Sequence, residues 1–273
     1  MSPVAAPIAV KKDHKTEHHG IERNDQYHWL RDPNWQQVMH DPSVLQSDIR
    51  EYLEAENAYF DEHMAAHEDL KEAIYREIRG RIKEDDTTVP FKHGDYAYFS
   101  RTQEGKQYSQ LCRTNRNGDN ETVLIDFNVE AGDRYFRSGG ASHSPNHQYL
   151  AWSCDRKGSE YFTIYVRDLA SGDELSDEIA NTTGGTVWAA DSKSFFYIVQ
   201  DENHRPHKVF QHKIGQPSEN DRLVYEEKDS GFFLGLSKTS SGNYILIDAN
   251  DHVTSEVHLI DAHNADEEPQ LVS

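Results

Sequence analysis

Cysteine is nearly absent from the 273-residue sequence, which contains only Cys112 and Cys154. Neither belongs to a CxxC pair, so a disulfide framework and a thiolate zinc site are both unsupported. Long apolar runs are also missing, and the most apolar stretches, such as Phe195–Val199, have the length of one strand rather than of a membrane span. The segment Met1–Val10 lacks the basic start of a signal peptide. We therefore expect a cytoplasmic protein with no membrane partner.

Basic residues are scarce. The chain has 28 Lys and Arg against 48 Asp and Glu, which gives a formal net charge of −20. This excess disfavours a nucleic acid partner and weakly favours basic ligands or peptides. The hydrophobic fraction of 36% is low, but 14 Tyr, 11 Phe and 4 Trp are too many for a disordered chain. The composition therefore predicts a folded, acidic protein.

The common catalytic motifs are missing as well. The GxSxG turn of serine hydrolases does not occur, and its nearest approach, Gly139-Gly140-Ala141-Ser142, lacks the second glycine. No GxGxxG motif or phosphate-binding loop is present. We therefore assign no catalytic residue and expect no cofactor.

Histidine is abundant, with 16 residues, so metal binding has to be considered. His63 and His67 are spaced i, i+4 on a predicted helix, which is the spacing of a ligand pair. No glutamate completes an HExxH motif between them and no third ligand is evident, so we interpret the pair as a solvated helix face. The turn His204-Arg205-Pro206-His207 either touches a ligand or is merely polar. We expect no metal site.

The first third of the chain is predicted to be helical. Asp41-Pro42 is a strong helix start, and apolar residues follow at helical spacing as far as Phe60. A second helix is predicted from about Glu68 to Ile82, with Leu70, Ile74 and Ile78 spaced by four. Two helices alone make a thin core, so this apolar stripe is expected to pack against another part of the protein.

After Thr87 the pattern becomes extended and repeats. Four apolar runs, Tyr96–Phe99, Tyr149–Trp152, Phe195–Val199 and Tyr244–Ile247, start 53, 46 and 49 residues apart. A shorter strand precedes each run, and a polar turn, an alternating strand and an outer strand follow it. Four strands per unit at a period near fifty are typical of β-propeller blades. The alternative is an antiparallel β-sandwich with chance spacing.

Several motifs resemble the prolyl oligopeptidase family of serine peptidases. The segment Asp25-Gln26-Tyr27-His28-Trp29-Leu30-Arg31-Asp32-Pro33 is similar to the N-terminal DPYRWLED motif of that family, and Tyr52–Tyr59 is similar to its next helix. Arg81–Asp86, Ser100–Thr102 with Glu104–Tyr108, and Val187–Asp191 resemble the oligopeptidase B, or protease II, branch. The similar motifs extend from about residue 20 to about residue 260.

The resemblance implies an α/β-hydrolase domain with a Ser-Asp-His triad, covered by a seven-bladed propeller that admits short peptides. It also implies cleavage after Lys or Arg, without a metal or organic cofactor. Ser273 falls in the outer strand of the fourth repeat. We therefore expect a mainly β chain with an N-terminal helical segment (1–86) and about four four-stranded blades of a partial β-propeller (87–273). The hydrolase domain is expected to be absent.

Two functional hypotheses follow. The first is the N-terminal part of an oligopeptidase-B-like endopeptidase, whose partners are its own hydrolase domain and short basic peptide substrates. The second is a stand-alone, non-catalytic propeller that binds a partner. For the first, the candidates for substrate or interdomain contact are Asp155, Arg156 and Glu160 at the end of the second blade. Plain solvent exposure is the alternative for each of these residues.

Overall fold

The computed structural model describes residues 5–272 and contains two compact units, with the division between Glu84 and Asp85. The sequence pattern predicts this boundary two residues later, after Asp86. Of the helices in the described residues, none combines the length and the apolar character that a membrane crossing requires. Both cysteines are buried and free.

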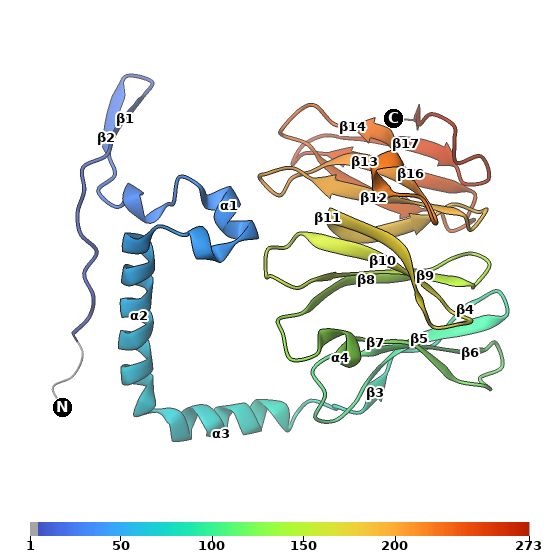
Figure 1. Cartoon of the computed structure of the whole chain (residues 1–273), viewed down its shortest axis with the longest axis horizontal. Coiled ribbons are helices and arrows are strands. Elements are labelled where there is room, and N and C mark those ends of the chain that lie inside the picture. The colour runs from blue at the N-terminus through green and yellow to red at the C-terminus, as the bar shows by residue number, and fades with distance from the viewer. Residues whose placement is uncertain (1–4, 273) are drawn as a thin grey trace. The chain divides into compact units, whose positions relative to one another are not determined.

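The first unit consists of a small hairpin followed by helices (Figure 1). Its elements are β1 (Lys15–His18), β2 (Ile21–Asn24), α1 (Trp35–His40), α2 (Ser47–Ala65) and α3 (Glu68–Arg79). Short 3₁₀ turns, η1 (His28–Leu30) and η2 (Pro42–Val44), connect them. The hairpin and α1 had no counterpart among the predicted elements.

The predicted helix start at Asp41-Pro42 was wrong by about one turn. Asp41 does cap a helical turn, because its side chain accepts a hydrogen bond from the backbone of Ser43, but this turn is only η2. Leu45 and Gln46 are then extended, and α2 begins at Ser47. The buried carboxylate of Asp32 fixes this break, since it accepts a hydrogen bond from the backbone of Gln46 at 2.9 Å.

The predicted apolar stripe of α3 is present and uncovered. Leu70, Ile74 and Ile78 are 60%, 48% and 58% exposed, and α3 buries no residue among those described. Such a continuous apolar helix face is unusual on a protein surface. The stripe is therefore a surface that the described residues of the first unit leave uncovered.

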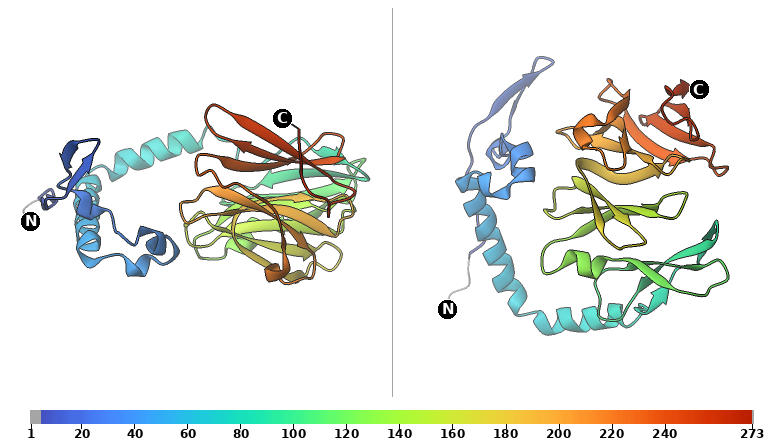
Figure 2. Two further views of the ribbon diagram at one scale, coloured as in Figure 1. Left: turned by 90° about the horizontal axis from the view of Figure 1, so that it is seen from above. Right: turned by 45° about the vertical axis from the view of Figure 1, so that its right-hand side comes forward.

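The second unit consists of four antiparallel blades stacked face to face in chain order (Figures 1 and 2). Blade 1 contains β3 (Asp86–Thr87), β4 (Phe91–His93), β5 (Tyr96–Thr102), β6 (Gln110–Asn115) and β7 (Thr122–Asp126), and α4 (Phe127–Ala131) follows it. Blade 2 contains β8 (Arg137–His143), β9 (Tyr149–Asp155), β10 (Phe162–Asp168) and the start of β11 (Glu174–Trp188). Blade 3 contains the end of β11, β12 (Ser194–Gln200), β13 (Pro206–Lys213) and β14 (Arg222–Glu226), with the 3₁₀ turn η3 (Ser218–Asn220) before β14. Blade 4 contains β15 (Phe233–Lys238), β16 (Tyr244–Asn250), β17 (Ser255–Asp261) and β18 (Gln270–Leu271).

The hydrophobic core lies between neighbouring blades. Successive residues of a strand point to opposite faces, so the second strand of a blade supplies the cores on both sides. In β9, Leu150 and Trp152 pack toward blade 1, whereas Ala151 packs toward blade 3. This arrangement explains the continuous apolar runs. It confirms the predicted mainly β fold with propeller blades, and the β-sandwich alternative was wrong.

Blades 2 and 3 share one strand, which the sequence analysis did not predict. The first part of β11 pairs with β10, as in Ile164↔Ile179, and its last part pairs with β12, as in Val187↔Phe196. The strand changes direction at Gly184, which has φ +89°. A Cβ at this residue would lie 2.8 Å from the Ser153 hydroxyl, so only glycine fits there without displacement. The two blades therefore form one seven-stranded sheet.

Candidate functional site

The turns of the second unit gather at two opposite ends of the blades, because consecutive strands are antiparallel. We name four strands of each blade A to D in chain order; in blade 1 these are β4 to β7, and β3 is an additional strand. The turns between strands B and C (103–109, 156–161, 201–205 and 251–254) form the BC end. The turns between A and B (94–95, 144–148, 189–193 and 239–243) and between C and D lie at the other end, which we call the AB end.

Asp155 organises its own turn at the BC end. It is 2% exposed, and its carboxylate accepts hydrogen bonds from three backbone amides of the turn at 2.7 to 3.0 Å. Asp201 in blade 3 and Asp251 in blade 4 accept backbone amides in the same way after their B strands. The repeat of this residue every 46 and 50 positions therefore has a structural cause in every one of these turns.

Arg156 and Glu160 lie in the same turn as Asp155. The Arg156 guanidinium donates to the backbone carbonyl of Glu130 at 2.8 Å and lies 5.4 Å from the Phe136 ring. Glu160 is exposed and pairs with Arg137 at 2.6 Å. An exposed pair of this kind is weak because water screens its charges, so Glu160 can exchange its partner at little cost. The predicted interdomain contact of these residues stays a prediction, and Glu160 is the candidate whose carboxylate faces solvent.

The two histidine motifs lie in different surroundings. His63 and His67 are exposed on the surface of the first unit, in agreement with a solvated face. In the turn of blade 3, Arg205 forms an ion pair with Asp201 at 3.1 Å and donates to the backbone carbonyl of Asp229 at 2.8 Å. Arg205 thereby ties its turn to the segment that leads into blade 4.

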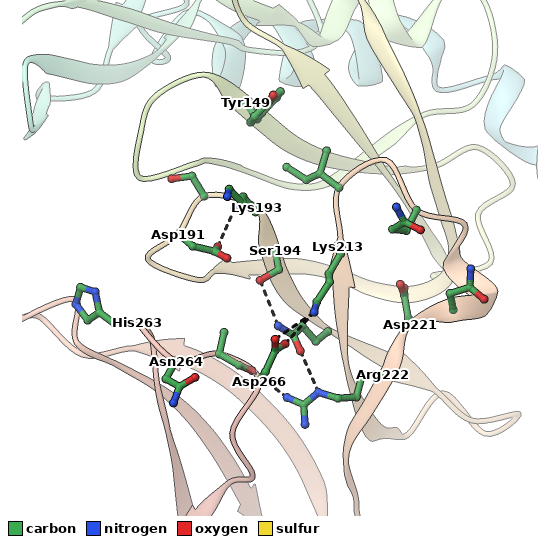
Figure 3. A pocket seen from close by; sticks show the side chains of 16 residues that line it. Tyr149, Asp191, Lys193, Ser194, Lys213, Asp221, Arg222, His263, Asn264 and Asp266 are labelled. Carbon is green, nitrogen blue, oxygen red and sulfur yellow. Dashed lines mark hydrogen bonds and ion pairs between the residues drawn. The ribbon is translucent and has the colours of Figure 1, made fainter.

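A pocket at the AB end lies between blades 3 and 4, and no sequence signal indicated it (Figure 3). It encloses about 750 Å³. Its charged lining residues are balanced, with three basic and three acidic side chains: Lys193, Lys213, Arg222, Asp191, Asp221 and Asp266. Lys213 pairs with Asp266 at 3.1 Å, which joins β13 of blade 3 to the turn after β17 of blade 4. The pocket therefore suits a polar ligand and does not select one sign of charge.

A buried charge network lies behind Asp221 of this pocket. The two ring nitrogens of His212 lie 2.7 Å from Asp177 Oδ1 and 2.8 Å from Asp221 Oδ1, and all three side chains are at most 2% exposed. Tyr197 donates its hydroxyl to the other oxygen of Asp221 at 2.8 Å. Since both ring nitrogens face carboxylates, both act as donors and the ring carries a positive charge.

The pKa values in this network follow from the balance of burial and pairing. Burial by itself lowers the pKa of His212, but the hydrogen bonds and charges of Asp177 and Asp221 outweigh it and raise the pKa to about 9. Burial likewise opposes ionisation of Asp177, but the bond from His212 holds the pKa of Asp177 below its usual value. The network is a buried ion cluster that holds three strands together.

The pocket contains no arrangement for nucleophilic catalysis. Among its described lining residues, Ser194 accepts a hydrogen bond from Gln211 and Ser192 accepts one from the backbone of Asn146. The histidine of the lining, His263, is hydrogen bonded to neither serine. A serine nucleophile needs an adjacent general base. The described lining of the pocket therefore shows no serine–histidine pair.

The four blades and the helices before them define the class of protein as a β-propeller with an N-terminal helical segment. The chain belongs to the prolyl oligopeptidase family: the family described as prolyl oligopeptidase, N-terminal beta-propeller domain, matches residues 7–273. Within that family it is similar to Protease 2 of Moraxella lacunata, with 33% identity over 97% of this chain and 38% of that protein. It is equally similar to dipeptidyl aminopeptidase BI of Pseudoxanthomonas mexicana, with 33% identity over 92% of this chain and 36% of that protein.

Solved structures give the same picture. Oligopeptidase B from Leishmania major superposes with a TM-score of 0.90 at 28% identity, covering 99% of this chain and 40% of that one. Oligopeptidase B from Trypanosoma brucei, in a closed form with covalently bound antipain, superposes with a TM-score of 0.86 at 27% identity and covers 98% of this chain and 39% of that one. The chain thus spans about two fifths of the length of these relatives. It is the propeller region of an oligopeptidase-B-like member of the family.

Proposed function

We propose that this chain is the access-controlling part of a serine endopeptidase that cleaves short peptides after Lys or Arg. The observation that carries the proposal is the likeness to Protease 2 and to oligopeptidase B across nearly the whole chain. In this proposal the hydrolase domain supplies the triad, and the propeller excludes folded proteins by size. The net charge of −20 favours basic peptides during encounter.

We further propose that the hydrolase domain covers the apolar stripe of α3. Leu70, Ile74 and Ile78 are each about half exposed or more, although they are spaced as one continuous helix face. A helix with such a face usually packs against a second apolar surface. Since the relatives are more than twice as long as this chain, their additional domain is the natural candidate for that surface.

A second specificity has its own support. Dipeptidyl aminopeptidase BI matches this chain at the same 33% identity as Protease 2, so release of dipeptides from an N-terminus is the alternative reaction. A non-catalytic binding module is the third candidate, and the pocket of about 750 Å³ between blades 3 and 4 favours it. A pocket of that size can hold a small polar molecule.

Activity assays separate these candidates. The 273-residue chain and the full reading frame that contains it are each assayed on a blocked arginyl amide, on a dipeptidyl amide with a free N-terminus and on a folded protein. We expect the full product to cleave only the blocked arginyl amide and the chain alone to cleave none. Preferred cleavage of the dipeptidyl amide would favour the second specificity. A reading frame that stops after Ser273 would favour the binding module.

Docking of the helices is tested separately. The triple variant Leu70→Ser, Ile74→Ser, Ile78→Ser is compared with a control, Val44→Ser, which changes another exposed apolar residue of the first unit. Because the stripe is exposed in the chain alone, we expect the triple variant to aggregate less and to retain its secondary structure by circular dichroism. In the full product the same variant is expected to lose activity, whereas the control retains it. Unchanged activity of the triple variant would refute the docking proposal.

We also propose a cytoplasmic location, as the composition predicts. Fractionation of cells that express the full reading frame tests it, and recovery of the protein in the secreted or membrane fraction would contradict it.

A further inference from the structure

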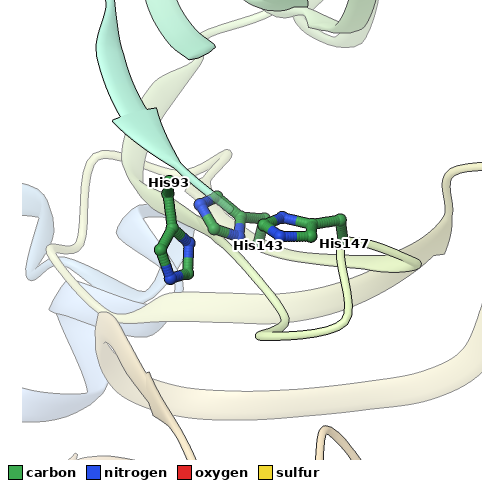
Figure 4. Close-up of side chains that lie close together, drawn as sticks. All are labelled: His93, His143 and His147. Atoms are coloured by element: carbon green, nitrogen blue, oxygen red, sulfur yellow. The ribbon is translucent and has the colours of Figure 1, made fainter. Parts of the chain in front are cut away.

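Three histidines from two blades come together at the AB end of blades 1 and 2 (Figure 4). His93 ends β4 of blade 1, His143 ends β8 of blade 2, and His147 lies in the turn that follows β8. One ring nitrogen of each lies within 4.8 Å of a ring nitrogen of the other two. About 50 residues separate His93 from the other two in sequence, so no local spacing revealed the set.

Hydrogen bonds to the protein orient two of the three rings. His143 Nδ1 lies 3.0 Å from the backbone carbonyl of Ser144, which fixes that nitrogen as the donor and leaves Nε2 with its lone pair. His147 Nδ1 lies 2.8 Å from the Tyr98 hydroxyl. Metal-binding histidines characteristically have their second nitrogen bonded to a carbonyl or another polar group in this way.

The rings are also packed in place. The Tyr98 ring stacks on His143 with centroids 3.9 Å apart, and the His93 ring lies 4.9 Å from that of His143. His147 Nε2 lies beside Gly94, because a Cβ on that glycine would be only 2.5 Å away. A glycine next to His93 therefore leaves the room that the His147 ring occupies.

The electrostatic surroundings suit a neutral donor set. Burial and the charges of the neighbouring histidines lower the pKa of His143 to about 4, and burial also lowers the pKa of His147. Neutral imidazole is the form that binds a metal ion. Two opposite charges act on His147, with Arg113 disfavouring a cation and Asp95 favouring one. These two charges therefore shift the pKa of His147 in opposite directions.

We propose that His93, His143 and His147 bind one Zn²⁺ ion, which clips blade 1 to blade 2. Three imidazoles with one open position for water are an established zinc set, with Zn–N distances of about 2.0 Å. Ligand nitrogens in such a site are about 3.3 Å apart, so the rings have to close slightly around the ion. His93 is exposed, so its ring has room for this movement. Two of the ligands belong to blade 2 and one to blade 1, so the ion opposes separation of the two blades.

Metal binding is tested on the tag-free 273-residue chain after removal of metal with EDTA. Zn²⁺ is titrated calorimetrically, and Co²⁺ serves as a spectroscopic probe because tetrahedral Co²⁺ shows strong visible bands. Removal of an outer partner of a metal ligand lowers affinity about 10–100-fold, so we expect His93→Ala to lower it about 100-fold or more. The control is His63→Ala, which changes an exposed histidine. His63 has His67 four residues away, but among the described residues it belongs to no group of three possible metal ligands. It is expected to leave the affinity unchanged.

A second variant tests the orienting bond without removing a ligand. Tyr98→Phe keeps the ring that stacks on His143 but removes the hydroxyl beside His147 Nδ1. We expect it to lower Zn²⁺ affinity about 10-fold or more while the Co²⁺ bands persist. If His93→Ala binds Zn²⁺ with the same affinity as the wild type, the proposal is overturned. A wild type that does not bind Zn²⁺ tightly would also overturn it. If only His63→Ala or other surface variants lower the Zn²⁺ affinity, the ion binds to surface histidines, and this result would likewise overturn the proposal.

Discussion

The buried ion cluster of blade 3 predicts that the stability of the second unit falls in alkali. His212 has its pKa raised to about 9 by Asp177 and Asp221, against an ordinary value of 6.5. A group whose pKa is higher in the folded state stabilises that state fully below its unfolded pKa, and the contribution is lost as the pH rises through the folded pKa. The loss therefore falls between pH 6.5 and about 9.

The size of the effect follows from the shift. A difference between 6.5 and about 9 corresponds to about 3 kcal/mol of unfolding free energy, since one pKa unit is worth about 1.4 kcal/mol. Asp177 acts in the opposite range, because its pKa is lowered and its contribution is lost only on acidification. Between the acid range, where the contribution of Asp177 is lost, and the alkaline range, where that of His212 is lost, we expect the cluster's contribution to the free energy of unfolding to be constant.

Urea unfolding between pH 6 and pH 10 measures this loss. Trp188 reports on the cluster, because its ring lies 5.2 Å from Phe195, which in turn lies 5.2 Å from the His212 ring. The comparison is with Asp177→Asn, which removes one carboxylate and with it part of the upward shift of the His212 pKa. We expect the free energy of unfolding to fall with pH by about 3 kcal/mol in the wild type and by clearly less in the variant. Parallel curves for the two proteins would refute the assignment of a charged His212.

Two further predictions concern the blades. Gly184→Ala is expected to destabilise the second unit by about 1–3 kcal/mol more than Gly172→Ala. Both glycines have positive φ, but only a Cβ at Gly184 would lie 2.8 Å from Ser153 Oγ. Equal melting temperatures of the two variants would contradict this expectation. Asp155→Ala is expected to be more damaging than Asp251→Ala by about 1–2 kcal/mol, since Asp155 is buried and Asp251 is only half-buried. Thermal unfolding measures both pairs, and a larger loss for Asp251→Ala would refute the second expectation.

The propeller blades were predictable because their signal is local. The second strand of each blade is buried on both faces, so its apolar run stands out at a regular period, as in Tyr149–Trp152. The α3 helix was also predictable, since its start at Glu68 and its apolar spacing are local properties. The start of α2 was not, because a bond from the distant Asp32 ends the preceding turn.

The candidate sites were much less predictable. Asp155 was singled out from its place in a turn, but only the backbone amides around it reveal that the turn depends on its carboxylate. The shared strand β11 was not predictable, because a four-strand repeat implies separate inner and outer strands for each blade. Its double role depends on pairing with β10 on one side and β12 on the other, which are separated along the chain.

By itself the sequence determined the repeat, the helix α3, the acidic charge and the resemblance to the prolyl oligopeptidase family, because each of these depends on residues that are near one another in the chain. Only the tertiary structure brought Asp177 to His212 and His93 to His147. Stacking of the blades decides which polar side chains meet, and no local pattern encodes it. For that reason the pocket, the buried imidazolium and the proposed zinc ligands emerged only from the folded chain.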